Sequence, residues 1–375
     1  MSAGAALRVI GFPGRYVQGP GALRSLGALV RELGGERPVV VSDDVVDAAL
    51  GTRVPEALAA ASLAATRLRF AGECTRAAID ELSGQARDAR ADLVIALGGG
   101  KTIDTAKGIA RALGARLVIA PTVASNDSPT SRLIVVYDDT HRLVGVDYLA
   151  RNPDLVLVDT EVIVRAPVRF FRAGIGDAIS KRYEAAQCAG AGGLNFFGGT
   201  PPDTAGILAD RCHAAIVAHG EAALEAVGRQ ACTPAVESVV EATVLLSGLG
   251  FESGGLSLSH ALLRGLSAVP ALAGALHGEQ VAFGTIVQLV LEGRPAAELE
   301  AHLGLLARLG LPTTLAALGW ARVSGEQIAQ VSALTMAAPY IGHFQSVLTA
   351  DTIARAIAQA DAAGSALIRT PQAAP

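Results

Sequence analysis

The sequence predicts an α/β domain with a parallel sheet flanked by helices, followed by an all-α domain. Over residues 1–165, short apolar runs alternate with helical segments, the pattern of a parallel sheet with helices on its faces. Beyond that point, alanine- and leucine-rich amphipathic segments replace the strand-like runs. A chain of 375 residues exceeds one typical core. We therefore expect two domains, residues 1–165 and 166–375.

Each element follows from its apolar pattern. Strands are expected at 38–42, 64–70, 93–97, 116–120 and 155–159, and a hairpin at 131–137 and 142–148. Helices of the first domain are expected at 22–33, 45–61, 75–90 and 101–111. Helices of the second domain are expected at 167–188, 203–228, 232–248, 252–267, 276–292, 296–309, 324–337 and 350–368.

A glycine turn joins the buried strand 93–97 to the next helix. Gly98, Gly99 and Gly100 precede Lys101 and Thr102, so free backbone N–H groups and the positive end of a helix dipole face an incoming anion. The expected guest is a phosphate or pyrophosphate, and the alternative is a purely structural turn. The P-loop is excluded because Ile95 stands where its first glycine belongs, and the G-x-G-x-x-G fingerprint because Ile103 stands at its third.

Composition excludes several classes of protein. A net charge of −4 gives no basic surface for nucleic acid. The four cysteines form no C-x-x-C pair, which indicates a reduced compartment. The sequence shows neither a signal peptide nor an apolar run of about 20 residues. We therefore expect a cytoplasmic protein without a membrane partner.

Three sets of residues are candidates for chemistry. Asp43 follows the strand 38–42, where it either accepts hydrogen bonds from a ribose diol or caps the next helix. Asp127 lies in the hydroxyl-rich segment 121–131, which is either a solvated turn or part of a binding site. Asp177, His260 and His277 suit zinc with an open position, or ferrous iron. On spacing alone, histidines of the core that bond to a backbone carbonyl are the more common explanation.

The motifs GGGKTIDTAK, PTVASNDSPTS, NPDLVLVDT, GIGDA, TPAVESVVEATVLLSGLGFESGGL and LHGEQVAFGT occur in this order along nearly the whole chain. Together they resemble the glycerol dehydrogenases of the iron-containing alcohol dehydrogenase superfamily. The resemblance implies a dehydroquinate synthase-like fold, with an NAD-binding domain, a helical domain and an active site in the cleft between them. It also implies a homo-oligomer, since family members form large rings such as octamers.

The resemblance further implies a role for each matching residue. NAD would place its pyrophosphate on Gly98, Gly99, Gly100, Lys101 and Thr102 and its ribose near Asp43. The residues implied on the nicotinamide side are Thr122, Ser125, Ser131, Leu133 and Tyr137. Asp177, His260 and His277 match the metal ligands, and Asp127 matches the acid that contacts a substrate hydroxyl. The implied activity is NAD- and metal-dependent oxidation of a small polyol or secondary alcohol.

Several positions depart from the family pattern. Lys181 stands where iron-using relatives carry a fourth, histidine ligand, which favours Zn²⁺ over Fe²⁺ because a charged lysine has no lone pair. Arg264 replaces an asparagine, and Gln280 a lysine. An anionic substrate, either a 2-hydroxy acid or a polyol phosphate, is an alternative because of the positive charges of Lys181, Arg264 and Arg132. A non-redox phosphate-binding protein is the alternative from another class.

Overall fold

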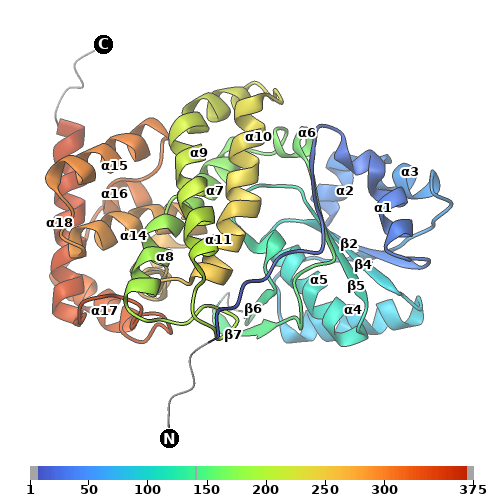
Figure 1. Cartoon of the computed structure of the whole chain (residues 1–375), viewed down its shortest axis with the longest axis horizontal. Coiled ribbons are helices and arrows are strands. Elements are labelled where there is room, and N and C mark those ends of the chain that lie inside the picture. Colours follow the sequence, from blue (N-terminus) through green and yellow to red (C-terminus); the bar gives the residue numbers. More distant parts are fainter. Residues whose placement is uncertain (1–6, 140–141, 370–375) are drawn as a thin grey trace, which may run out of the picture. The chain divides into compact units, whose positions relative to one another are not determined.

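The computed structural model describes residues 7–139 and 142–369. They fall into two compact units. One unit comprises residues 11–171 and 225–248, and the other residues 1–10, 172–224 and 249–375. The first boundary between the units, at 171/172, lies six residues beyond the expected boundary at 165/166. Both units are discontinuous in sequence, because the helical segment 225–248 belongs to the sheet unit and the N-terminal residues belong to the helical unit. Figure 1 shows the elements of each unit.

The sheet unit contains six parallel strands in the order β1-β8-β5-β4-β2-β3. Their bounds are β1 Tyr16–Gly19, β2 Pro38–Ser42, β3 Thr66–Arg69, β4 Leu93–Gly98, β5 Arg116–Pro121 and β8 Leu155–Asp159. All residues of β2, β4 and β8 are buried, which explains their continuous apolar sequences. The predicted strands are confirmed. β1 was missed because its four residues are only half-buried and carry a weak apolar signal.

Helices cover both faces of this sheet (Figure 1). Leu26, Val30 and Leu58 pack with Val40 and Ile95 on one face. The opposite core holds apolar residues of α4 and α5, together with Val94 and Ile119. The helices are α1 Leu26–Glu32, α2 Asp44–Leu50, α3 Arg53–Ala59, α4 Arg76–Asp88, α5 Gly100–Leu113 and α6 Thr160–Ile163.

Two local predictions in this unit have different outcomes. The hairpin is confirmed, with β6 Leu133–Tyr137 antiparallel to β7 Leu143–Tyr148; residues 140–141 of its expected loop lie outside the described part. The single helix expected at 45–61 is wrong, because the chain breaks between α2 and α3 at Gly51. Gly51 has φ +57°, a left-handed conformation that ends a helix readily.

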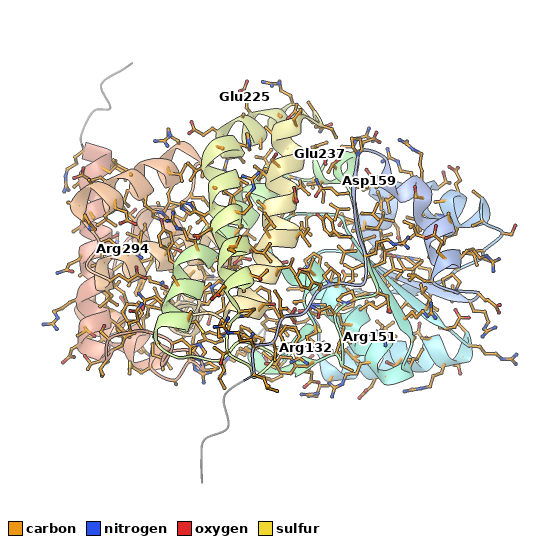
Figure 2. All side chains as sticks on the ribbon, in the orientation of Figure 1. Arg132, Arg151, Asp159, Glu225, Glu237 and Arg294 are labelled. Carbon is orange, nitrogen blue, oxygen red and sulfur yellow. The ribbon has the colours of Figure 1, made fainter. Side chains whose placement is uncertain are left out.

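Hydrogen bonds attach residues 225–248 to the sheet unit. Glu237, on α10 (Pro234–Val240), accepts from Gln18 Nε2 at 2.6 Å and from Thr160 Oγ1 at 2.6 Å. Asp159, also labelled in Figure 2, accepts from the backbone N–H groups of Gly21 and Leu23 at 2.9 and 3.0 Å. These buried contacts fix the end of β8 and the start of α6.

The helical unit confirms most of the second series of predicted helices. Its main helices, two of which begin before the unit, are α7 Val168–Ala178, α8 Lys181–Gly190, α9 Asp203–Gly228, α11 Ser247–Gly254, α12 Leu258–Ala261, α13 Leu263–Leu266, α14 His277–Leu291, α15 Ala296–Arg308, α16 Leu315–Leu318, α17 Gly325–Thr335 and α18 Ala350–Arg369. The helix expected at 167–188 is broken between α7 and α8. The break expected near residue 250 lies instead at Gly255, whose φ is +88°.

Within the described part of the chain, one helical stretch, Pro234–Gly254, is long and apolar enough to cross a membrane, but 67% of its most apolar 18-residue window is buried inside the protein. Burial of this kind is typical of a core helix in a soluble protein. The stretch contains a π-helical segment, Glu241–Leu246, and such segments are frequent at functional sites.

A buried histidine, His302 on α15, and a half-buried one, His213 on α9, lie on either side of Tyr183 on α8. His302 stands edge-on to the ring of Tyr183, whose hydroxyl is 3.3 Å from His213 Nε2. Neither ring nitrogen of His302 has a hydrogen-bond partner. Burial, with a smaller effect of His213, lowers the pKa of His302 to about 3. Burial and then the charge of Arg182 lower the pKa of His213 to about 4.

These depressed pKa values predict a loss of stability in acid. An unfolded histidine binds a proton near pH 6.5, whereas the folded protein resists until about pH 4 at His213 and about pH 3 at His302. The unfolded state therefore binds more protons in this window, and the free energy of unfolding falls as pH falls below about 6.5. His302→Leu should flatten the fall in Tm between about pH 7 and pH 5. Identical slopes in the variant and the wild type would refute this.

Candidate active site

The candidate cofactor site lies in the sheet unit, where the sheet reverses its order of strands. β3 lies on one side of β2, whereas β4 and then β5 lie on the other. Ligands of open α/β sheets bind outside the carboxyl ends of the strands at such a switch point. Asp43 follows β2 and Gly99 follows β4, so the structure places both predicted cofactor residues at this position of the fold.

The glycine turn leaves no room for side chains. A Cβ on Gly98 would stand 2.6 Å from Thr102 Oγ1, and one on Gly100 would stand 2.9 Å from Asn126 Nδ2. Gly99 is the N-cap of α5 and provides no side-chain cap, so the first N–H groups of the helix lack a side-chain acceptor. Bare backbone at a helix N-terminus fits a pyrophosphate.

Lys101 makes a contact that the sequence did not suggest. Its Nζ lies 2.7 Å from Glu73 Oε2, and the Glu73 side chain is buried. Thr102 is buried within the same turn. The backbone of the turn is therefore the part of this motif best arranged to bind phosphate oxygens.

Asp43 is the N-cap of α2, because its Oδ1 accepts from Val46 N at 2.8 Å. The capping alternative for Asp43 is thus confirmed, and it uses one carboxylate oxygen. Asp44 instead forms exposed ion pairs with Arg67 and Arg69, whose hydrogen bonds hold the pKa of Asp44 well below its usual range.

A buried lysine, which the sequence analysis did not single out, fixes the hydroxyl-rich segment. Lys107 Nζ donates to Ser128 O at 2.8 Å and Leu133 O at 2.7 Å, and contacts Asp104 Oδ1 at 3.2 Å and Ser131 Oγ at 3.3 Å. Its side chain is fully buried. Lys107 therefore holds Ser131 and Leu133, two of the expected nicotinamide residues, against α5.

The same segment is fixed from its other side by residues of the π-helical stretch and the start of α11. Ser247 Oγ donates to Asp127 Oδ2 at 3.0 Å, and Thr130 Oγ1 donates to Val244 O at 3.2 Å. A Cβ on Gly248 would stand 1.8 Å from Thr130 Oγ1, so this approach requires glycine. Asp127 is thereby held in one orientation.

The remaining residues expected near the nicotinamide lie directly after β5 (Thr122), in the loop that follows (Ser125) and at the end of β6 (Tyr137). Thr122 N donates to Gly98 O at 3.1 Å, and Tyr137 N donates to Cys74 O at 2.9 Å. Ser125 is half-buried in the loop after β5. Arg132, labelled in Figure 2, lies 5.0 Å from the centroid of the Tyr148 ring and donates to Leu149 O. The contacts of Arg132 are therefore with residues at the end of the hairpin.

The candidate metal site lies in the helical unit, where glycines bring three candidate ligands together. Asp177 is near the end of α7, His260 is on α12, and His277 begins α14. A Cβ on Gly278 would stand 1.7 Å from Ala173 O, and one on Gly176 would stand 2.4 Å from Gly278 O. Gly176, beside Asp177, and Gly278, beside His277, therefore permit the backbones of α7 and α14 to come into contact.

The three side chains fit a tetrahedral metal ion. Asp177 Oδ1 lies 3.2 Å from His260 Nε2 and 3.6 Å from His277 Nε2, and the three donor atoms lie within 4.8 Å of one another. Bonds of about 2.0–2.1 Å in a tetrahedron separate ligand atoms by about 3.3–3.4 Å. Asp177 Oδ2 is buried without a hydrogen-bond partner, and a bound cation is one partner that would satisfy such an oxygen.

Glu184, which the sequence analysis did not identify as a site residue, supports His260. Its Oε2 lies 2.6 Å from His260 Nδ1, and its Oε1 accepts from Ser257 N and His260 N, each at 3.0 Å. A carboxylate on Nδ1 orients Nε2 toward a metal. Glu184 lies seven residues after Asp177, on the neighbouring helix, a spacing that offered the only sequence signal.

Lys181 points into this cluster. Its Nζ donates to Asp177 Oδ1 at 2.6 Å and lies 3.1 Å from His260 Nε2, and the side chain is 0% exposed. The ammonium charge is thus matched inside the protein by Asp177. This arrangement does not favour the anionic-substrate alternative, which needs Lys181 to attract a substrate carboxylate or phosphate.

Charges within the cluster shift its pKa values. Burial acts to lower the pKa of His260, but the negative charge of Glu184 and hydrogen bonds to Asp177 and Glu184 raise it to about 9. Burial acts to raise the pKa of Asp177, but the charges of Lys181 and His277 hold it well below its usual range.

Two other departures from the family pattern lie on neighbouring helices. Arg264 is exposed on α13. Gln280 is buried on α14 and donates to Ala275 O at 3.3 Å. Gln280 therefore stabilises the turn that precedes His277.

Comparison with known proteins identifies the family of the chain. Residues 13–160 match the iron-containing alcohol dehydrogenase family. The chain is 42% identical to a glycerol dehydrogenase of Escherichia coli O6:H1 over 83% of its length and 84% of that protein. It is 42% identical to a glycolaldehyde reductase of Halobacterium salinarum, covering 82% and 84% of the two chains.

Solved structures give the same result. The crystal structure of glycerol dehydrogenase from Schizosaccharomyces pombe is 34% identical and superimposes with a TM-score of 0.93, covering 97% of this chain and 92% of that one. Identity and coverage of this extent show membership of a family. The chain therefore belongs to the iron-containing alcohol dehydrogenase family, in its glycerol dehydrogenase group.

Proposed function

We propose that the protein is a zinc-dependent, NAD-linked dehydrogenase whose substrate is glycerol or a closely similar small polyol. Family membership makes it an NAD- and metal-dependent alcohol or polyol dehydrogenase. The observation that carries the proposal is the convergence of Asp177, His260 and His277 within 4.8 Å. A bound metal supplies Lewis-acid polarisation of the alcohol oxygen, and NAD accepts the hydride.

The protein's own residues bind and orient. We assign the pyrophosphate to the bare backbone of Gly98, Gly99 and Gly100, and the ribose to the oxygen of Asp43 that does not cap α2. Lys107 fixes Ser131 and Leu133, and we assign these two residues, together with Thr122, Ser125 and Tyr137, to the nicotinamide side. Asp127, held by Ser247, accepts a hydrogen bond from a substrate hydroxyl. Positioning of this kind accounts for a large part of an enzyme's rate.

Zinc is proposed over iron because two histidines and one carboxylate form the usual set for catalytic zinc. Glu184 completes this set as the carboxylate that orients His260. We also propose that the enzyme is cytoplasmic. We further propose that it is a homo-oligomer, because the family that it resembles forms rings.

A substrate panel tests the function. Glycerol, other small polyols, glycolaldehyde and 2-hydroxy acids are compared with NAD and with NADP, in the oxidising and reducing directions. We expect the largest kcat/KM with a neutral polyol and NAD. The glycolaldehyde arm is included because of the Halobacterium salinarum relative. Highest activity with a 2-hydroxy acid would contradict the proposed substrate class.

Asp43 is expected to make NAD the preferred cofactor, because a carboxylate beside the ribose repels a 2′-phosphate. Asp43→Asn keeps an N-cap on α2 but removes the charge. The substitution should therefore reduce the cofactor preference, which is kcat/KM with NAD divided by kcat/KM with NADP, by about tenfold or more. Asp88→Asn, on the exposed end of α4, is the matched control. A wild-type preference for NADP would show the assignment to be wrong.

A further inference from the structure

The proposed metal site already contains a positive charge of its own. Lys181 Nζ lies 2.6 Å from Asp177 Oδ1 and 3.1 Å from His260 Nε2. These are two of the three donors assigned to the metal. Asp177 Oδ1 is also the carboxylate oxygen that His260 and His277 both approach.

The distances decide whether ammonium and metal fit together. Asp177 Oδ1 and His260 Nε2 are 3.2 Å apart. With bonds of about 2.0 Å to both atoms, a zinc ion would lie between about 1.2 and 3.6 Å from Lys181 Nζ, whichever side of that pair it occupied. A dication and an ammonium at such a separation repel each other strongly in a buried site.

The surroundings keep the ammonium in place when no metal is bound. The side chains of Lys181 and Asp177 are 0% and 1% exposed. Lys181 Nζ also lies 5.6 Å from the centroid of the Phe251 ring, a favourable place for a cation. Asp177 and Lys181 are four residues apart across the break between α7 and α8, and this spacing holds the pair on one side of the cluster.

We propose that Lys181 is an internal competitor of the metal, so that its ammonium and the divalent ion bind Asp177 alternately. This proposal rests on the assignment of Asp177, His260 and His277 as the metal ligands. In the metal-free state the ammonium neutralises Asp177 and preserves the fold. In the metal-bound state the flexible four-carbon stem carries the ammonium away from Asp177. The cost of that exchange weakens the apparent affinity for the metal.

Zinc affinity is the direct test. Chelator-treated wild type, Lys181→Met and Lys181→Arg are titrated with zinc against a competing chromophoric chelator at one pH. Lys181→Met keeps the length of the side chain but removes its charge, so it should bind zinc about 100-fold or more tightly than wild type, the size expected for removing a buried charged competitor. Lys181→Arg keeps the charge and should show no such gain.

Arg182→Met is the matched control. Arg182 is the next residue, is half-exposed, and pairs with Asp210 outside the cluster. Arg182→Met removes one positive charge from the same helix. The zinc affinity of this variant should therefore equal that of wild type. An equal gain in Arg182→Met would show a general charge effect and would overturn the proposal.

Thermal unfolding gives a second readout. Lys181→Met should lower the Tm of the metal-free protein, because the buried carboxylate of Asp177 loses its ammonium partner, and zinc should raise its Tm more than that of wild type. If metal-free Lys181→Met does not fold, the rate of zinc loss to excess chelator is measured on zinc-loaded proteins and should be slower in the variant.

The outcomes separate this proposal from the proposed function. Tight zinc binding that is equal in wild type and Lys181→Met overturns the competition and leaves the metal site intact. Zinc binding that survives the combined loss of His260 and His277 contradicts the metal site itself, and the competition with it.

Discussion

His277→Ala is expected to lower kcat/KM for glycerol oxidation by about a thousandfold, the scale of the several kcal/mol that a metal contributes as a Lewis acid. His277 is the cleanest of the three ligands to remove. Its side chain is 45% exposed, whereas His260 is held on both sides by Asp177 and Glu184. The Tm of the metal-free variant should therefore stay close to that of wild type.

Zinc content, kcat/KM and Tm are measured together on the same preparations. His260→Ala should lose as much activity but also some stability, because Glu184 loses its charged partner. His219→Ala, a substitution on α9, is the control and should leave all three quantities unchanged. Wild-type activity in His277→Ala would mean that this side chain is not a metal ligand.

Lys107→Met should produce the largest loss of stability, about 3–5 kcal/mol of the free energy of unfolding. The substitution leaves the buried carboxylate of Asp104 without its cation, and the carbonyl groups of Ser128 and Leu133 without their donor. Burial already raises the pKa of Asp104, and Lys107 opposes that rise. Urea unfolding followed by circular dichroism measures the loss.

A double variant tests the cause. Asp104→Asn combined with Lys107→Met removes both charges and should recover part of the stability, because no unpaired buried charge remains. In the single variant, the KM for NAD should rise as Ser131 and Leu133 lose their fixed position. Full stability in Lys107→Met would show that this buried pair has no structural role.

The sequence predicted the buried strands and long helices because their apolar patterns are continuous. β2, β4 and β8 lie wholly inside the sheet unit, and α9 has the expected bounds. The errors concern glycine and short elements. Gly51 divides one predicted helix and Gly255 moves the end of another. Glycine inside a helix costs only about 1 kcal/mol relative to alanine. Helix propensity therefore does not show which glycine will end a helix.

The site was predicted less evenly. Asp177, His260 and His277 were identified and converge in the structure, although their separation in sequence carries no geometric information. Lys107, Glu184 and Glu73 were not identified as site residues. Each acts through a buried contact with a segment distant in the chain or with a separate helix. Such contacts follow from tertiary packing, which no local pattern describes.

The measurement that tests the account most directly is the restoration of activity by metal. Metal is removed with a chelator and verified by elemental analysis, and glycerol oxidation is followed by NADH formation as zinc is added. We predict negligible activity without metal and a plateau at one zinc ion per chain, with no restoration in His277→Ala at the same zinc concentrations. Full activity of wild type in a verified metal-free preparation would contradict the account.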